Sequence, residues 1–135
     1  MKTDVRALLQ TTLDHAFDYL LIPVNIRVFW NRRSETAVED PDEYIVYTLD
    51  SDPYDSYADD EPLTRTAEAT VRYYYRDTFI DTRAGRAQIK SREAAIETAL
   101  RSAGFTLPQG GFDAGDIDDI GFGTVVFPAE YWEVV

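Results

Sequence analysis

The amino-acid sequence predicts an α+β fold, in which a mostly antiparallel β-sheet carries two helices on one face as a two-layer sandwich. Residues 63–75 alternate between apolar and polar side chains, as a long half-buried strand does. Two other segments repeat apolar residues at helical spacing. The remaining strand patterns follow one another without helical crossovers, which favours antiparallel pairing. At 135 residues, the chain has the usual size of one domain, so we expect a single domain over 1–135.

The N-terminal half is expected to form one helix and two strands. Thr3 is the predicted N-cap of a helix whose apolar stripe reaches Leu20 and which should end before Pro23. Residues 24–30 are β-branched and aromatic and predict a strand. Residues 43–49 are apolar on both faces and predict a strand inside the sheet. The inward side chains of the first strand should be Val24, Ile26, Val28 and Trp30.

The long strand at residues 63–75 should bury its odd-numbered side chains and can run on as far as Ile80. Gly85 argues against a helix through residues 82–88, so Ser91 is the expected N-cap of the second helix. Gly104 is expected to end that helix in a Schellman motif. Residues 106–119 predict a connector and residues 120–135 a last strand, which should lie at an edge or carry a bulge where Pro128 lacks its N–H.

Composition excludes several classes of function. A net charge of −12 argues against a surface that neutralises many phosphates, so direct, tight nucleic-acid binding is not expected. The chain has no cysteine, which excludes disulfides and thiolate metal sites. Its apolar runs are far shorter than the roughly 20 residues that span a bilayer, and MKTDVRALL lacks the apolar core of a signal peptide. We therefore expect no membrane association and a cytoplasmic location by default.

The sequence offers little catalytic machinery. His15 is the single histidine and lies at the margin of the first apolar stripe, which favours a solvent-facing side chain over a catalytic base or metal ligand. No nucleophile elbow, Walker loop or dinucleotide fingerprint is present. An acidic run resembles a hard-cation site in composition, but its spacing does not fit an EF-hand loop, and a solvated turn is favoured. The run consists of Asp113, Asp116, Asp118 and Asp119. We predict no catalytic, cofactor or metal site.

Charge and tyrosine content point to contacts between proteins. Residues 34–64 contain no lysine or arginine, residues 65–92 are basic, and no cation follows Arg101. These blocks are either solvated loops of one sign or complementary patches that meet between subunits. Tyrosine is enriched in interfaces, and the triplet at 73–75 should expose at least one ring. The candidate contact residues are Tyr54, Tyr57, Asp59, Asp60, Arg72, Tyr74, Arg76, Arg83 and Arg86.

Residues 39–77, the helix IKSREAAIETALRSAGF and the ending FDAGDIDDIGFGTVVFPAEYW resemble the tail-completion proteins of long-tailed bacteriophages and prophages. The resemblance implies a small α+β protein without enzymatic residues that forms a ring of its own copies, for example a hexamer. Such a ring terminates the tail tube at its head-proximal end and joins the head connector or stopper protein. DNA passes through without specific binding. The implied location is the virion tail, and the host cytoplasm during assembly.

Two alternatives from other classes stay open. The acidic chain would also suit an adaptor or inhibitor domain that binds a basic protein, which predicts a tight complex and no ring. A small hydrolase or metal-dependent enzyme would use the acidic run, and this alternative predicts calcium or magnesium binding. Its ligands would be Asp113, Asp116 and Asp119.

Overall fold

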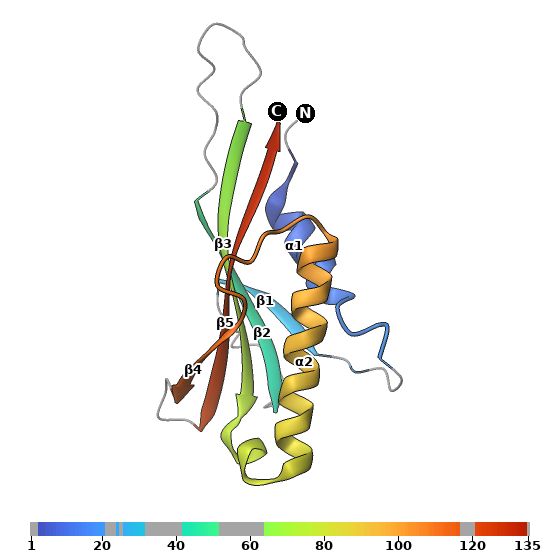
Figure 1. The fold of residues 1–135 in the computed structure, drawn as a ribbon, viewed down its shortest axis with the longest axis vertical. Coiled ribbons are helices and arrows are strands. Elements are labelled where there is room, and N and C mark those ends of the chain that lie inside the picture. The colour runs from blue at the N-terminus through green and yellow to red at the C-terminus, as the bar shows by residue number, and fades with distance from the viewer. Residues whose placement is uncertain are drawn as a thin grey trace, which may run out of the picture.

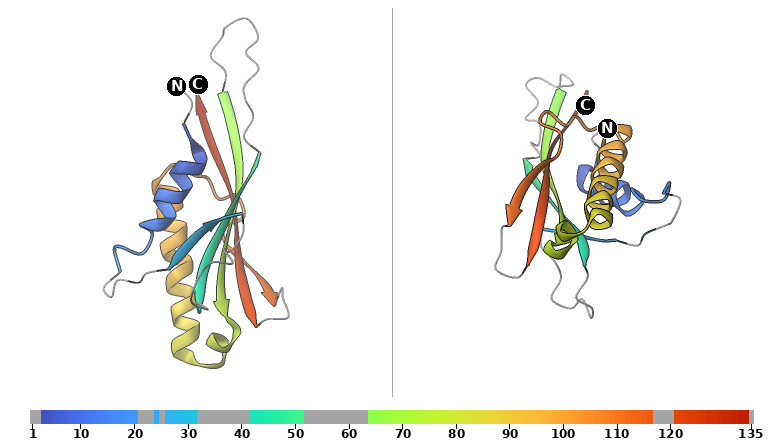
Figure 2. Two further views of the ribbon diagram at one scale, coloured as in Figure 1. Left: turned by 180° about the vertical axis from the view of Figure 1, so that it is seen from behind. Right: turned by 60° about the horizontal axis from the view of Figure 1, so that its bottom comes forward.

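The structure is a computed structural model that describes residues 3–20, 24, 26–31, 42–51, 64–116 and 121–134, without the side chains of residues 115 and 116. The five strands form one sheet in the order β1-β2-β3-β5-β4, and both helices cover the same face (Figures 1 and 2). This confirms the predicted two-layer α+β fold. The elements are α1 (Val5–Asp14), β1 (Arg27–Trp30), β2 (Glu43–Ser51), β3 (Thr64–Arg76), the 3₁₀ helix η1 (Asp77–Asp81), α2 (Arg83–Ser102), β4 (Phe112–Asp116) and β5 (Phe122–Val134).

Strand β3 lies at the centre of the sheet and pairs antiparallel with both β2 and β5. Its odd-numbered side chains face the helices and are buried, as predicted, and they include the buried cation Arg65. The predicted extension to Ile80 is wrong, because the chain turns into η1 after Arg76. Neighbouring strands β2 and β5 reach no further than this point, so a longer β3 would have no strand partner among the described residues.

Strand β1 pairs parallel with β2, whereas the other named pairs are antiparallel, so the sheet is mostly antiparallel, as expected. Strand β2 lies between β1 and β3, which confirms its interior position. The inward assignment of Trp30 is wrong in part. Its ring is half-exposed and lies under the Arg6 guanidinium, 4.2 Å from centroid to Cζ, because the strand ends where the core ends. Phe29, expected outward, is buried against the opposite face of the sheet.

Helix α1 begins one residue later and ends earlier than predicted. The Asp4 carboxylate, not Thr3, caps it by accepting a hydrogen bond from the Ala7 N–H at 3.1 Å. After Asp14 the chain continues in tighter turns, such as Ala16 N–H to the Leu13 carbonyl at 3.2 Å. These turns bring the adjacent side chains of Ala16 and Phe17 into the core together, which a regular helix does less well.

Helix α2 begins at Arg83, so the predicted start at Ser91 is wrong. The Thr82 hydroxyl caps it by accepting a hydrogen bond from the Gly85 N–H at 2.9 Å. A Cβ at Gly85 would lie 2.0 Å from the carbonyl oxygen of Phe79, so glycine permits the close approach of η1 and does not break the helix. The C-terminal prediction is confirmed, since Gly104 has φ of 103° and the Phe105 N–H donates to the Leu100 carbonyl at 3.0 Å.

The predicted connector at 106–119 contains an additional strand, β4, which pairs with the first half of β5. The ladder between them stops at Val126, and the next contact with β5 is the bridge between Thr106 and Glu130. Pro128 lies in the interval between these contacts. Its missing N–H therefore falls where β5 is locally an edge, as predicted.

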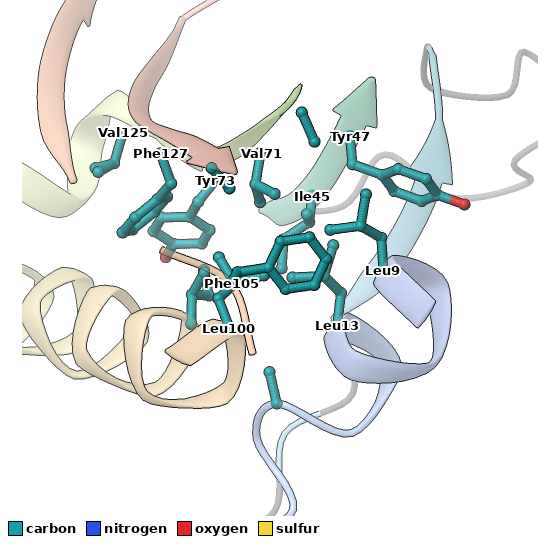
Figure 3. Packing of buried hydrophobic residues seen from close by; sticks show 14 of the residues in the cluster. Leu9, Leu13, Ile45, Tyr47, Val71, Tyr73, Leu100, Phe105, Val125 and Phe127 are labelled. Carbon is teal, nitrogen blue, oxygen red and sulfur yellow. The ribbon is translucent and has the colours of Figure 1, made fainter. Parts of the chain in front are cut away.

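The core lies between the sheet and the two helices (Figure 3). Leu9 and Leu13 of α1 and Leu100 of α2 meet the inward side chains of β2, β3 and β5. One polar cluster crosses this apolar layer. The Glu43 carboxylate of β2 accepts hydrogen bonds from Arg92 Nε of α2, at 3.1 Å, and from the Tyr73 hydroxyl of β3. Burial, together with the bond to Glu43, raises the pKa of Tyr73 far above its usual value, so the phenol stays a donor.

No helix in the described ranges is long and apolar enough to cross a membrane.

The position of the α2 N-cap is testable with two alanine substitutions. We expect Thr82→Ala to lower the free energy of unfolding by about 1 kcal/mol, because the Gly85 N–H loses its acceptor. Ser91→Ala should leave it unchanged or raise it slightly, because Ser91 is exposed inside the helix and alanine is the better helix former. Urea denaturation of both variants checks this. A larger loss for Ser91→Ala would contradict the observed helix start.

Candidate interaction surface

The structure divides the predicted contact residues among three places. Tyr54, Tyr57, Asp59 and Asp60 lie outside the described residues. The remaining five residues do not form one patch. Arg72, Tyr74 and Arg76 point to the sheet face opposite the helices. Arg83 and Arg86 lie on the first turn of α2. We call the sheet face opposite the helices the outer face.

Tyr74 is part of a second apolar cluster, on the outer face. Its ring stacks on Tyr44 with centroids 4.7 Å apart and an interplanar angle of 11°. Phe122 meets Tyr44 edge-on at 5.3 Å, and the Arg76 guanidinium lies 4.4 Å from the centroid of Phe122. The expectation that Tyr74 presents its ring to solvent is therefore wrong in part, because the ring is half-buried by its aromatic neighbours.

Further along the same face, three carboxylates surround a hollow of about 200 Å³. Glu68 of β3 and Glu130 of β5 are direct cross-strand partners, and Asp50 of β2 lies beside them. The Asp50 carboxylate accepts hydrogen bonds from the hydroxyls of Thr48, at 2.7 Å, and Thr70. None of the described cations forms an ion pair with any of the three. We call this group the acidic hollow.

Large apolar side chains are exposed on the same face. Trp132 is 59% exposed, Val134 is 61% exposed and Phe112 is 43% exposed. Trp132 and Val134 follow Glu130 on the outward positions of β5, so they adjoin the acidic hollow. Neither described helix covers this face (Figure 2). The sequence analysis did not predict the acidic hollow or the exposed apolar side chains. The available signal was the last strand, in which the outward residues Glu130 and Trp132 alternate with inward apolar residues.

A second hollow, of about 630 Å³, lies between α1 and α2 and is lined mainly by alanine, serine and threonine. His15 borders it and is exposed, with Nδ1 at 2.7 Å from Asp18 Oδ2. The predicted solvent-facing histidine is confirmed. The hollow offers no second acid or base to the imidazole, since its other side chains are uncharged.

The structure describes only part of the acidic run between Asp113 and Asp119. Asp113 is exposed, whereas the side chain of Asp116 and the whole of Asp118 and Asp119 lie outside the description. Within the part of the chain that the structure describes, no three histidine, aspartate or glutamate side chains gather closely enough to hold a metal ion.

An ion pair ties the N-terminal segment to the end of the β3–β5 ribbon. Arg65 Nε donates to Glu133 Oε1 at 2.8 Å, and the Thr3 N–H and hydroxyl donate to the same carboxylate at 2.9 and 2.6 Å. Partial burial alone would raise the pKa of Glu133. The hydrogen bonds from Thr3 and Arg65 outweigh this effect, so the pKa lies below its usual value of 4.5.

A depressed pKa means that the ionised Glu133 stabilises the folded state above the unfolded pKa, and that this stabilisation disappears as pH falls through the folded pKa. We expect Glu133→Gln to lower the free energy of unfolding by about 2 kcal/mol at neutral pH. The difference from wild type should shrink in acid. Urea denaturation across a pH series checks this, with Glu97→Gln as the control, because the ion pair of Glu97 with Arg101 lies on the helix surface and contributes little. A pH-independent difference would contradict the assigned role.

The acidic hollow predicts a gain in stability when one charge is removed. Like charges directly opposite in a ladder repel, so Glu68→Gln should raise the free energy of unfolding by about 0.5 kcal/mol at low ionic strength. Added salt should reduce this gain. Glu97→Gln is the matched control. Glu97 accepts a hydrogen bond from Arg101 at 3.1 Å, so removing its charge should not raise the free energy of unfolding. Equal responses of the two variants would argue against cross-strand repulsion.

Comparison of the sequence with models of known protein families and with curated proteins finds no match. The resemblance to tail-completion proteins therefore stays a prediction, and the function must be inferred from the surfaces that the described residues form.

Proposed function

We propose that the protein is a structural virion protein of a long-tailed bacteriophage or prophage. In this proposal it forms a ring at the head-proximal end of the tail, terminates the tail tube and joins it to the head connector, without performing a reaction. The observation that carries the proposal is the outer face of the sheet, which combines exposed Trp132, Val134 and Phe112 with carboxylates that no described cation pairs with.

This combination is typical of a surface that other protein subunits cover. Aromatic side chains are enriched at interface centres, and a tryptophan that becomes buried there is often a dominant contact. A two-layer sandwich normally leaves one sheet face to solvent, and such a face then carries mainly polar side chains. Here Trp132 and Val134 break that pattern beside Glu130.

Two further points support the finer proposal. The observed order of helices and strands agrees with the small α+β protein that the resemblance implies. The net charge of −12 suits a ring through which DNA should pass without binding. The acidic hollow also favours a second candidate, an adaptor that binds a basic protein, and the two differ in whether the chain assembles with copies of itself.

The proposal is tested by incubating the protein with tail-tube protein and examining the mixture by electron microscopy and light scattering. We expect rings that cap one end of the tube and stop its growth. Trp132→Ser should weaken assembly about tenfold or more, because it removes exposed apolar area from the contact. Tyr19→Ser is the matched control, since Tyr19 is exposed on the opposite layer. A monomer that binds only a basic partner and never caps tubes would favour the adaptor.

A further inference from the structure

The acidic hollow carries negative charge that no described cation neutralises. Glu68 and Glu130 face each other across the ladder, and none of the described cations pairs with them or with Asp50. Residues 34–64, which include β2 and the connection from β2 to β3, contain no lysine or arginine. A cation that pairs with the acidic hollow is therefore not among the described residues of the same copy, and it would relieve the repulsion between the two glutamates.

Three exposed cations lie in the first half of α2. Arg83, Arg86 and Lys90 are spaced by three and four residues, so they share one side of the helix, and all three are exposed. Arg86 Nη1 donates to the Ile80 carbonyl at 2.7 Å, and this bond leaves its charge without a carboxylate partner among the described residues. We call these three residues the cationic stripe.

The two surfaces cannot meet within one copy. The acidic hollow is on the outer face, whereas α2 packs on the opposite face, with the sheet between them. They also lie toward different ends of the molecule. The acidic hollow is near the start of β3, which extends beyond α2, whereas the cationic stripe is at the start of α2, at the opposite end (Figure 1).

We infer that the acidic hollow of one copy binds the cationic stripe of a second copy, with Trp132 adding apolar contact beside it. This inference rests on the proposed function, because it names the contact through which the ring would close. A hollow of about 200 Å³ bordered by three carboxylates offers an arginine fork several acceptors at once. The exposed ring of Trp132 next to Glu130 offers a face on which a guanidinium can stack.

The proposed contact is heterologous, because each copy uses two different surfaces. A head-to-tail contact of this kind closes into a ring when the rotation between copies permits and otherwise gives a filament. The charges also select the partner surface, because two acidic hollows or two cationic stripes repel each other. A second copy is therefore the occupant that the described charges favour.

Charge reversal tests the pairing. Sedimentation velocity at low salt should show that E68K/E130K and R83E/R86E each associate at least about tenfold more weakly than wild type. An equimolar mixture of the two variants should regain assembly, because each reversed surface meets its reversed counterpart. D14K/D18K reverses two exposed carboxylates near α1, outside both surfaces, and should assemble like wild type. Circular dichroism of each variant checks that it is folded.

A crosslinking test is independent of changes in charge. The chain has no cysteine, so E130C and R86C variants each carry a single thiol. A short bis-maleimide should crosslink the two variants in a mixture far more efficiently than it crosslinks E130C to itself. Preferential E130C–E130C crosslinking would indicate a symmetric contact and overturn the inference.

The outcomes separate this inference from the proposed function. Assembly that caps tail tubes and withstands both charge reversals would overturn the contact and leave the ring function intact. Assembly that depends on the contact, with no capping of tubes, would support the contact and overturn the function. Wild-type protein that stays monomeric both at low salt and with tube protein, with no mixed crosslink, would overturn both.

Discussion

The register of β3 between β2 and β5 decides where every other part of the structure lies. Side chains alternate strictly along a strand, so one alignment assigns Val71 and Tyr73 to the core and Glu68 and Arg72 to the outer face. A slip of one residue would place Glu68 and Arg72 under the helices. The alignment that completes the core is therefore also the alignment that sets Glu68 opposite Glu130.

The helix layer is fixed to this sheet by the cluster of Glu43, Arg92 and Tyr73. The Arg92 and Glu43 side chains are 10% and 11% exposed, so removing either partner would leave a nearly buried charge unpaired. The cluster sets the position of α2 along the sheet, because Arg92 must reach the first residue of β2. The cationic stripe lies earlier in the same helix, so its position is set by the same ion pair.

Sequence alone predicts those features whose signals are local. The alternation around Val71, the Gly104 helix end and the edge position of Pro128 each follow from one residue type in one short pattern. Gly85 was misleading because its reason is a tertiary contact with the Phe79 carbonyl, which no local pattern reveals. Strand β4 contains glycine and aspartate and has weak intrinsic preference, so its existence depends on pairing with β5. The acidic hollow requires the register of three strands, β2, β3 and β5, and the stacking of Tyr74 on Tyr44 requires the register of β2 and β3.

The acidic hollow makes the isolated chain less stable than the fold permits, since threonine at both glutamate positions would suit an exposed ladder better. A cation from a second copy would remove this penalty, so association through the hollow and folding of the sheet would stabilise each other. The net charge of −12 acts in the opposite direction at longer range and keeps copies apart until unlike surfaces align. Repulsion at a distance combined with attraction at one surface favours a single mode of contact over random aggregation, which is the property that a closed ring requires.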